Sequence, residues 1–180
     1  QQQNNLCQII STKLSAVRNN IASIADSFNI YHVNIFLPDD SFASKEGLTF
    51  CSLSDLKKYK VQLSDFSKQG LTPNWIFRKD INFPYMVSKG EEPSGVLSCY
   101  RYAKINSQKT CLAVHITSEE LSNYLNTFSE GNPSLSYIIN SEGVVLSSTD
   151  KKQIGGSLSN EKLHAITQNL RLSHFSYDKC

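Results

Sequence analysis

The stretch LSYIINSEGVVLSSTDKKQIGGSL, residues 135–158, decides the fold class of this chain. Two apolar runs, 137–139 and 144–146, flank the turn sequence Asn-Ser-Glu-Gly, whose glycine can adopt a positive φ. Asp150 can then cap a short helical turn that ends at Gly155. A tight hairpin followed at once by helical residues predicts an α+β protein.

The N-terminal segment 1–29 has apolar residues spaced alternately by three and four, which predicts one long amphipathic helix. These residues are Cys7, Ile10, Leu14, Val17, Ile21, Ile24 and Phe28. In one interpretation the part after Leu14 lies against the protein's own sheet. In another, the first half continues a transmembrane helix and pairs with its twin in a dimer. The two interpretations are compatible.

A second hairpin is predicted at the centre of the sheet, from strands 96–105 and 110–117. With the turn at 106–108, Cys99 lies opposite His115. The bulky face then carries Val96, Ser98, Tyr100, Tyr102, Leu112, Val114 and Ile116, and we expect it to pack on the N-terminal helix. The other face carries Leu97, Cys99, Arg101, Ala103, Cys111, Ala113 and His115.

The second of these faces is the candidate ligand site, because small side chains leave space around two convergent polar groups, Arg101 and His115. The planar guanidinium of Arg101 could bind a carboxylate or a sugar, or it could simply pair with Asp80. The aromatic segment 75–86 is either core packing or a lid that forms the pocket wall. The predicted ligand-binding residues are Arg101, His115, Cys99, Trp75, Tyr85 and Asp80.

Thr117 and Glu120 have the spacing of a capping box, which opens a predicted helix over 118–128. The Gly-Asn-Pro sequence at 131–133 then marks a boundary. We therefore expect a signalling helix at 1–29, a sensing module at 30–130 and a short second module at 131–180.

The pattern of 135–158, read as strand, Gly turn, strand, Ser-Ser-x-Asp and Ile-Gly, closely resembles the extracellular Cache (PAS-like) sensor domains of bacterial membrane receptors. Among these, it is most similar to sensor histidine kinases of the YesM-like type. The resemblance implies a long N-terminal helix packed on a PAS-like antiparallel sheet, with 131–180 as a truncated membrane-proximal module. In the amino-acid-binding version of the family an Arg, Trp-Tyr and Asp constellation binds the ligand. Here Trp75 is followed by Ile76, so that motif is not matched.

The resemblance further implies an extracytoplasmic ligand-sensing domain of a two-component histidine kinase in the cell membrane. Its partners would be a small solute or a solute-binding protein, and a second copy through the N-terminal helix, with no cofactor. The kinase chemistry would lie outside this chain. A sensor domain of a chemoreceptor or a diguanylate cyclase is an alternative, as is a secreted hydrolase that uses Cys99 and His115.

Composition and motifs narrow the other classes of function. The 18 basic and 16 acidic residues are spread along 180 positions, without the basic stripe that nucleic-acid binding requires. The five cysteines include no Cys-x-x-Cys pair, and the four histidines are not at metal-ligand spacing from them, so we expect no metal site. The sequence contains no P-loop, nucleophile elbow or dinucleotide-binding motif.

Overall fold

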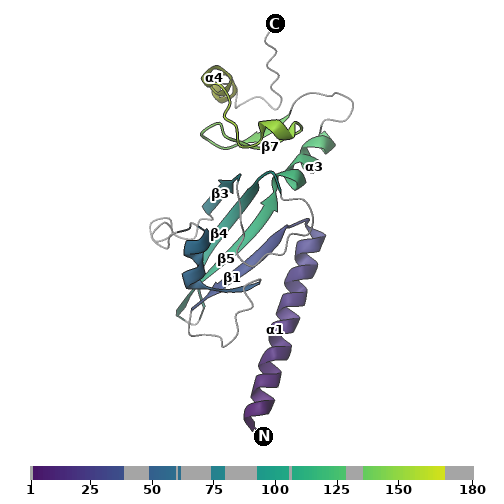
Figure 1. Cartoon of the computed structure of the whole chain (residues 1–180), viewed down its shortest axis with the longest axis vertical. Helices are drawn as coiled ribbons and strands as arrows, with labels where there is room; N and C mark the ends of the chain where they lie inside the picture. The colour runs from purple at the N-terminus through teal and green to yellow at the C-terminus, as the bar shows by residue number, and fades with distance from the viewer. Residues whose placement is uncertain are drawn as a thin grey trace.

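The computed structural model describes residues 2–38, 49–59, 61, 74–79, 93–105, 107–128 and 136–168. The fold is α+β, as predicted, with a mixed five-stranded sheet and a separate two-stranded hairpin (Figure 1). The elements in chain order are α1 (Gln2–Ser27), β1 (His32–Leu37), β2 (Phe50–Ser52), the 3-10 helix η1 (Leu53–Tyr59), β3 (Asn74–Arg78), β4 (Val96–Ile105), β5 (Gln108–Thr117), α3 (Ser118–Phe128), β6 (Tyr137–Ile139), β7 (Val145–Ser148), the 3-10 helix η2 (Lys151–Gln153) and α4 (Asn160–Gln168). None of the helices in these ranges is long and apolar enough to cross a membrane.

The predicted N-terminal helix is present as α1, and three residues of its apolar stripe are exposed, whereas Leu14 and Ile21 are half-buried. Val17, Ile24 and Phe28 are 44%, 53% and 68% exposed. The N-terminal part of α1 runs past the sheet, and α1 meets the sheet where it leads into β1 (Figure 1). Val96 and Tyr100 of the predicted bulky face are instead buried with Leu56 and Tyr59 of η1, so the expectation that this face packs on α1 is wrong for these strand residues.

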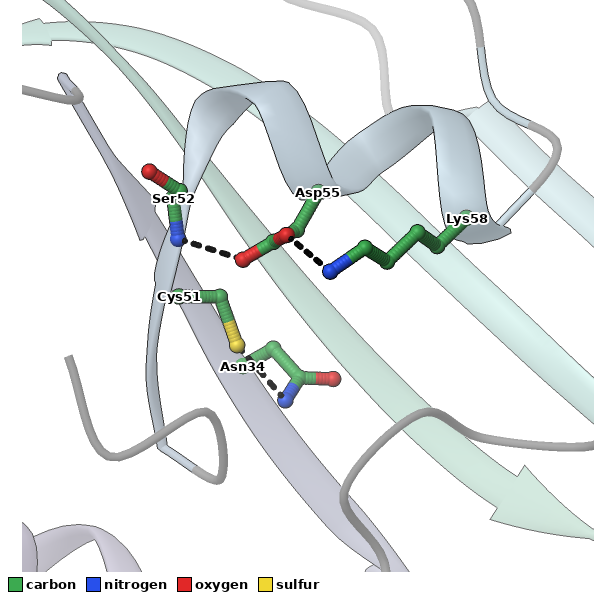
Figure 2. Close-up of polar contacts among 5 residues, drawn as sticks. All are labelled: Asn34, Cys51, Ser52, Asp55 and Lys58. Atoms are coloured by element: carbon green, nitrogen blue, oxygen red, sulfur yellow. Dashed lines mark hydrogen bonds and ion pairs between the residues drawn. The ribbon is translucent and has the colours of Figure 1, made fainter.

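The strand order of the five-stranded sheet is β2-β1-β5-β4-β3. All neighbouring pairs are antiparallel except β1 and β2, which run parallel, so the expectation of a wholly antiparallel sheet is wrong at this edge. Residues 38–49 connect β1 to β2. The parallel pairing joins Ile35–Leu37 of β1 to Phe50–Ser52 of β2. Asp55 stabilises the start of η1, because its carboxylate accepts a hydrogen bond from the Ser52 N–H at 3.1 Å (Figure 2).

The central hairpin of β4 and β5 forms as predicted, with its register shifted by one residue. Ile105 pairs with Gln108, so the connection has two residues, and Ser107 within it has a φ of 63°. A three-residue turn at 106–108 would have placed Cys99 opposite His115. Ser98 lies there instead. Because side chains alternate along a strand, this shift places Cys111, Ala113 and His115 of β5 on the same face as Ser98 and Tyr100. They were expected on the face of Cys99 and Arg101.

The two faces of the sheet differ sharply in burial. On the closed face, side chains from β1, β4 and β5 are buried together with Leu56 and Tyr59 of η1. The closed-face strand residues that are fully buried are Asn34, Phe36, Val96, Ser98, Tyr100, Cys111, Ala113 and His115. The open face carries Trp75 at 53% and Leu112 at 41% exposure, together with the exposed Arg101.

The stretch from 136 to 158 folds as predicted. β6 and β7 pair as an antiparallel hairpin, and Gly143 in the turn has a φ of 78°. The Asp150 side chain caps η2 by accepting a hydrogen bond from the Lys152 N–H at 3.0 Å. Gly155 has a φ of 77°, the left-handed conformation expected after a helical turn.

Serine hydroxyls join α3 to β7. Ser118 Oγ donates to the Leu146 carbonyl at 2.7 Å, and Ser147 Oγ donates to the Ser118 carbonyl at 2.8 Å. Thr117 Oγ1 accepts from the Glu120 N–H at 3.1 Å, which is one half of the predicted capping box. These contacts attach the C-terminal hairpin to the end of the sheet, and α4 lies at the opposite end of the long axis from the start of α1 (Figure 1).

Candidate functional site

The predicted ligand-binding residues do not form one site. Arg101 and His115 lie on opposite faces of the sheet, Arg101 exposed on the open face and His115 fully buried on the closed face. Cys99 and Trp75 are register partners and lie on the open face with Arg101. Trp75 belongs to the edge strand β3, so it is not part of a lid. The two other predicted residues, Tyr85 and Asp80, lie outside the described residues.

The closed face instead holds a buried polar network centred on His115. Its Nδ1 atom is 2.8 Å from Ser98 Oγ, and its Nε2 atom is 2.8 Å from Asn34 Oδ1. Asn34 Nδ2 donates to Cys51 Sγ at 3.6 Å, and the Cys51 side chain points towards Asn34 from the middle of β2 (Figure 2). Because the amide nitrogen of Asn34 faces the sulfur, its oxygen faces His115, and this assigns the proton of the neutral imidazole to Nε2.

Three aromatic rings surround the imidazole of His115. Tyr59 and His32 stack on it with ring centroids 6.3 and 6.4 Å away, and Tyr100 meets it edge-on at 5.9 Å. Burial, followed by the charges of His32 and Arg78, lowers the pKa of His115 to about 3. His115 is therefore neutral near pH 7, and it holds β1, β4 and β5 together through hydrogen bonds at both ring nitrogens.

Arg78 is the residue that sequence reasoning missed. It lies at the end of β3, opposite Val96, and its side chain runs along the closed face. Its Nη1 atom is 3.5 Å from the Tyr100 hydroxyl, and its Cζ atom is 6.0 Å from the centre of the Tyr100 ring. The sequence does carry a signal for it. Arg78 comes two residues after Ile76, and side chains alternate along a strand, so both lie on the same face of β3.

Cys99 and His115 do not form the nucleophile and base of a hydrolase. Cys99 is opposite Val114 and faces away from His115, so the predicted pairing of a Cys99 nucleophile with a His115 base is wrong. Burial raises the pKa of Cys99, and burial together with Cys99 raises the pKa of Cys111 to about 12. Cys99 and Cys111 lie on opposite faces of the sheet as separate thiols.

Ser98, His115 and Asn34 together resemble a hydrolase triad only in composition. In such a triad the nucleophile contacts Nε2 and the orienting residue contacts Nδ1. Here Ser98 contacts Nδ1 and Asn34 contacts Nε2, and all three side chains are fully buried. The described ranges also contain no group of three or more His, Cys, Asp or Glu side chains that could hold a metal ion.

The closed face therefore brings together aromatic rings, a neutral imidazole and the guanidinium of Arg78, and hydrogen bonds within it connect β1, β4 and β5. Comparisons of the chain with protein-family models, with curated proteins and with solved structures find no match.

Proposed function

We propose that this chain is an extracytoplasmic ligand-sensing domain of a membrane receptor, with a two-component histidine kinase as its output. The observation that carries the proposal is the direct connection between α1 and the polar network. α1 ends near Asn29, which has a φ of 50°, and the Tyr31 N–H then bonds to the His115 carbonyl at 2.9 Å. Three residues later Asn34 bonds to the His115 ring at 2.8 Å.

This connection supports a mechanical output. A ligand on the closed face would alter the position of β1 relative to β5. Only residues 28–31 separate the end of α1 from the start of β1. A displacement of β1 would therefore move the end of a long straight helix. A solute can shift such an equilibrium only by its differential affinity for the two states, so the ligand must contact groups that move with β1. His32 and Asn34 on β1 are such groups.

The exposed stripe of α1 supports a receptor that acts as a homodimer. Its apolar residues keep the alternating three and four spacing of a two-stranded coiled coil, and those at Val17, Ile24 and Phe28 are exposed. A second copy aligned in parallel would cover this stripe. In such a receptor α1 would lead towards the membrane, and the described residues 136–168 would then be membrane-distal, since α4 lies at the other end of the long axis from the start of α1 (Figure 1). This proposal differs from the membrane-proximal position that the sequence resemblance implies for the second module.

The alternatives differ in how far the residues support them. A chemoreceptor or a diguanylate cyclase would use the same sensing surface, and the difference would lie in segments outside this chain. The Cys99 and His115 hydrolase has lost its geometric basis, since the two side chains lie on opposite faces. A binding domain therefore remains the proposal that the closed face supports best.

A solute screen by thermal unfolding tests the proposal. A solute at about a hundred times its dissociation constant stabilises the native state by about 2.7 kcal/mol, a clear rise in melting temperature. We expect the rise to be lost in His32→Gln, on the closed face, and kept in Arg101→Gln, on the open face. The proposal is contradicted if no small solute or solute-loaded binding protein alters the melting temperature, or if the shift depends on Arg101 and not on His32.

A further inference from the structure

The contact between α3 and β7 contains two serine hydroxyls that have more hydrogen-bond partners than protons. Ser122 Oγ lies 2.8 Å from the Ser118 carbonyl oxygen and 2.9 Å from the Ser148 carbonyl oxygen. Ser147 Oγ lies 2.8 Å from the Ser118 carbonyl oxygen and 2.8 Å from Ser122 Oγ. Ser118, Ser147 and Ser148 are fully buried, and Ser122 is half-buried. Each hydroxyl donates one proton, so two protons serve four short contacts.

The hydrogen bond between Ser122 and Ser147 can point in either direction. In the first arrangement Ser122 donates to Ser147, and Ser147 donates to the Ser118 carbonyl of α3. In the second, Ser147 donates to Ser122, and Ser122 donates to the Ser148 carbonyl of β7 or back to the Ser118 carbonyl. Because each serine is donor in one arrangement and acceptor in the other, reversal of one hydroxyl requires reversal of its neighbour.

The other side of α3 is attached to the sheet by bonds that have one arrangement only. The Ser118 N–H donates to the Gly95 carbonyl at 2.9 Å, and the Ser94 N–H donates to Glu119 Oε1 at 3.0 Å. An added Cβ atom at Gly95 would lie 2.7 Å from Phe77 Cζ, so the backbone and this ring are already in close contact. The first turn of α3 is therefore fixed to the start of β4, and a movement of the C-terminal hairpin has to occur at the α3–β7 contact.

The hairpin itself is internally bonded. The Val145 N–H donates to the Gly156 carbonyl and the Gly155 N–H donates to the Val145 carbonyl, both at 2.8 Å, so residues 154–156 move with β7. Tyr124, a large side chain of α3, is 50% exposed and does not wedge the hairpin in place. A hydroxyl that changes its acceptor stays hydrogen-bonded, so a small displacement here leaves no buried donor unpaired.

From this arrangement we propose that the α3–β7 contact is a joint with two positions, in which reversal of the Ser122–Ser147 hydrogen bond accompanies a small sliding of the hairpin along α3. The first position draws Ser147 towards the Ser118 carbonyl, and the second draws Ser122 towards the Ser148 carbonyl. Small sliding of packed elements is a known type of conformational change. The joint goes beyond the proposed sensing function and does not depend on it, because it involves neither the closed face nor a ligand.

Amide chemical shifts of the full chain, measured by NMR, test the proposal. Ser122→Ala leaves Ser147 to donate to the Ser118 carbonyl, as in the first arrangement. Ser147→Ala leaves Ser122 to donate to a carbonyl, as in the second. We expect the wild-type signals of β6 and η2, which neither substitution touches directly, to lie on the line between those of the two variants, or to appear as two sets at their positions. Ser141→Ala, at the exposed turn of the same hairpin, is the control and should leave the signals of η2 at their wild-type positions.

Ser122→Cys and Ser147→Cys, under reducing conditions, keep the side-chain shape and weaken the donor, so they remain informative if an alanine variant fails to fold. We expect Ser122→Cys to move the signals towards the first position and Ser147→Cys to move them in the opposite direction. Wild-type signals that coincide with those of one variant would show a single arrangement and overturn the proposal. So would displacement of the signals in the same direction by both substitutions, or unchanged signals of β6 and η2 in both. A failed solute screen leaves the joint standing, and a failed joint leaves the sensing function standing.

Discussion

The Nε2 atom of His115 lies 2.8 Å from Oδ1 of Asn34, and this hydrogen bond ties the middle strand of the sheet to the strand that follows α1. Both side chains are fully buried, so neither can exchange its partner for water. The bond therefore couples the closed face to the long helix, and it is the first feature to test by substitution.

Asn34→Ala removes a partner from both His115 and Cys51. We expect it to lower the free energy of unfolding by about 1–3 kcal/mol, because a buried N–H is left without an acceptor. Urea unfolding measures the change. Asn19→Ala, at an exposed position of α1, is the control, and surface substitutions of this kind stay within about 0.5 kcal/mol. A loss for Asn34→Ala no larger than that of the control would show that the network does not stabilise the fold.

The lowered pKa of His115 makes stability depend on pH. The unfolded imidazole has a pKa of about 6.5, and the native one has a pKa of about 3. Between these values the unfolded state binds one proton more, so the stabilisation is complete above about pH 6.5 and is lost as the pH falls towards about 3. We expect a contribution of up to about 1.4 kcal/mol per pH unit in this range.

His115→Asn should remove this contribution to the pH slope, and His164→Gln, at an exposed position of α4, should leave it unchanged. Urea unfolding at several pH values between 7 and 5 compares the three proteins. A wild-type slope equal to that of His115→Asn would mean that His115 takes up a proton in the native state.

Gly155 adopts a φ of 77°, and an added Cβ atom would lie 2.8 Å from Lys79 Cδ. Both Gly155→Asn and Gly155→Val must displace the flexible Lys79 side chain, but asparagine tolerates the left-handed conformation and valine does not. We expect the free energy of unfolding of Gly155→Val to be lower than that of Gly155→Asn by at least about 1 kcal/mol. Urea unfolding monitored at the β6–β7 hairpin gives the difference. Equal stability of the two variants would mean that the turn relaxes to another conformation.

The exposed stripe of α1 predicts a parallel pairing of two copies. Val17→Cys should form a disulfide-linked dimer under mild oxidation at high protein concentration, because equivalent core positions of a parallel coiled coil lie close together. Asn19→Cys, on the opposite side of the helix, should not. Mass spectrometry identifies the linked peptides and separates them from bridges made by native cysteines. Equal cross-linking of both variants would contradict a specific interface.

The local elements of this fold could be predicted from the sequence because short-range patterns specify them. α1, α3 and the hairpin at 137–148 follow from apolar spacing, a capping threonine and a glycine turn. The positive φ values of Gly143 and Gly155 follow from the same reasoning.

The candidate site could not be predicted in the same way, because it depends on one register. The sequence around Asn106 permits a turn of two or three residues, and the choice decides whether Ser98 or Cys99 lies opposite His115. Asn34 reaches His115 from a strand 81 positions away, a distance over which apolar spacing gives no information. Arg78 was missed because its inward direction is set by the pairing of β3 with β4.

Amide hydrogen exchange, with and without a solute that raises the melting temperature, tests most directly the central claim that the closed face senses a ligand and transmits the event to α1. We predict added protection in β1 and β4 and a change in exchange at the last turn of α1, all reduced in His32→Gln and retained in Arg101→Gln. Protection confined to 136–168, or the absence of any solute that alters exchange in β1, would contradict the claim.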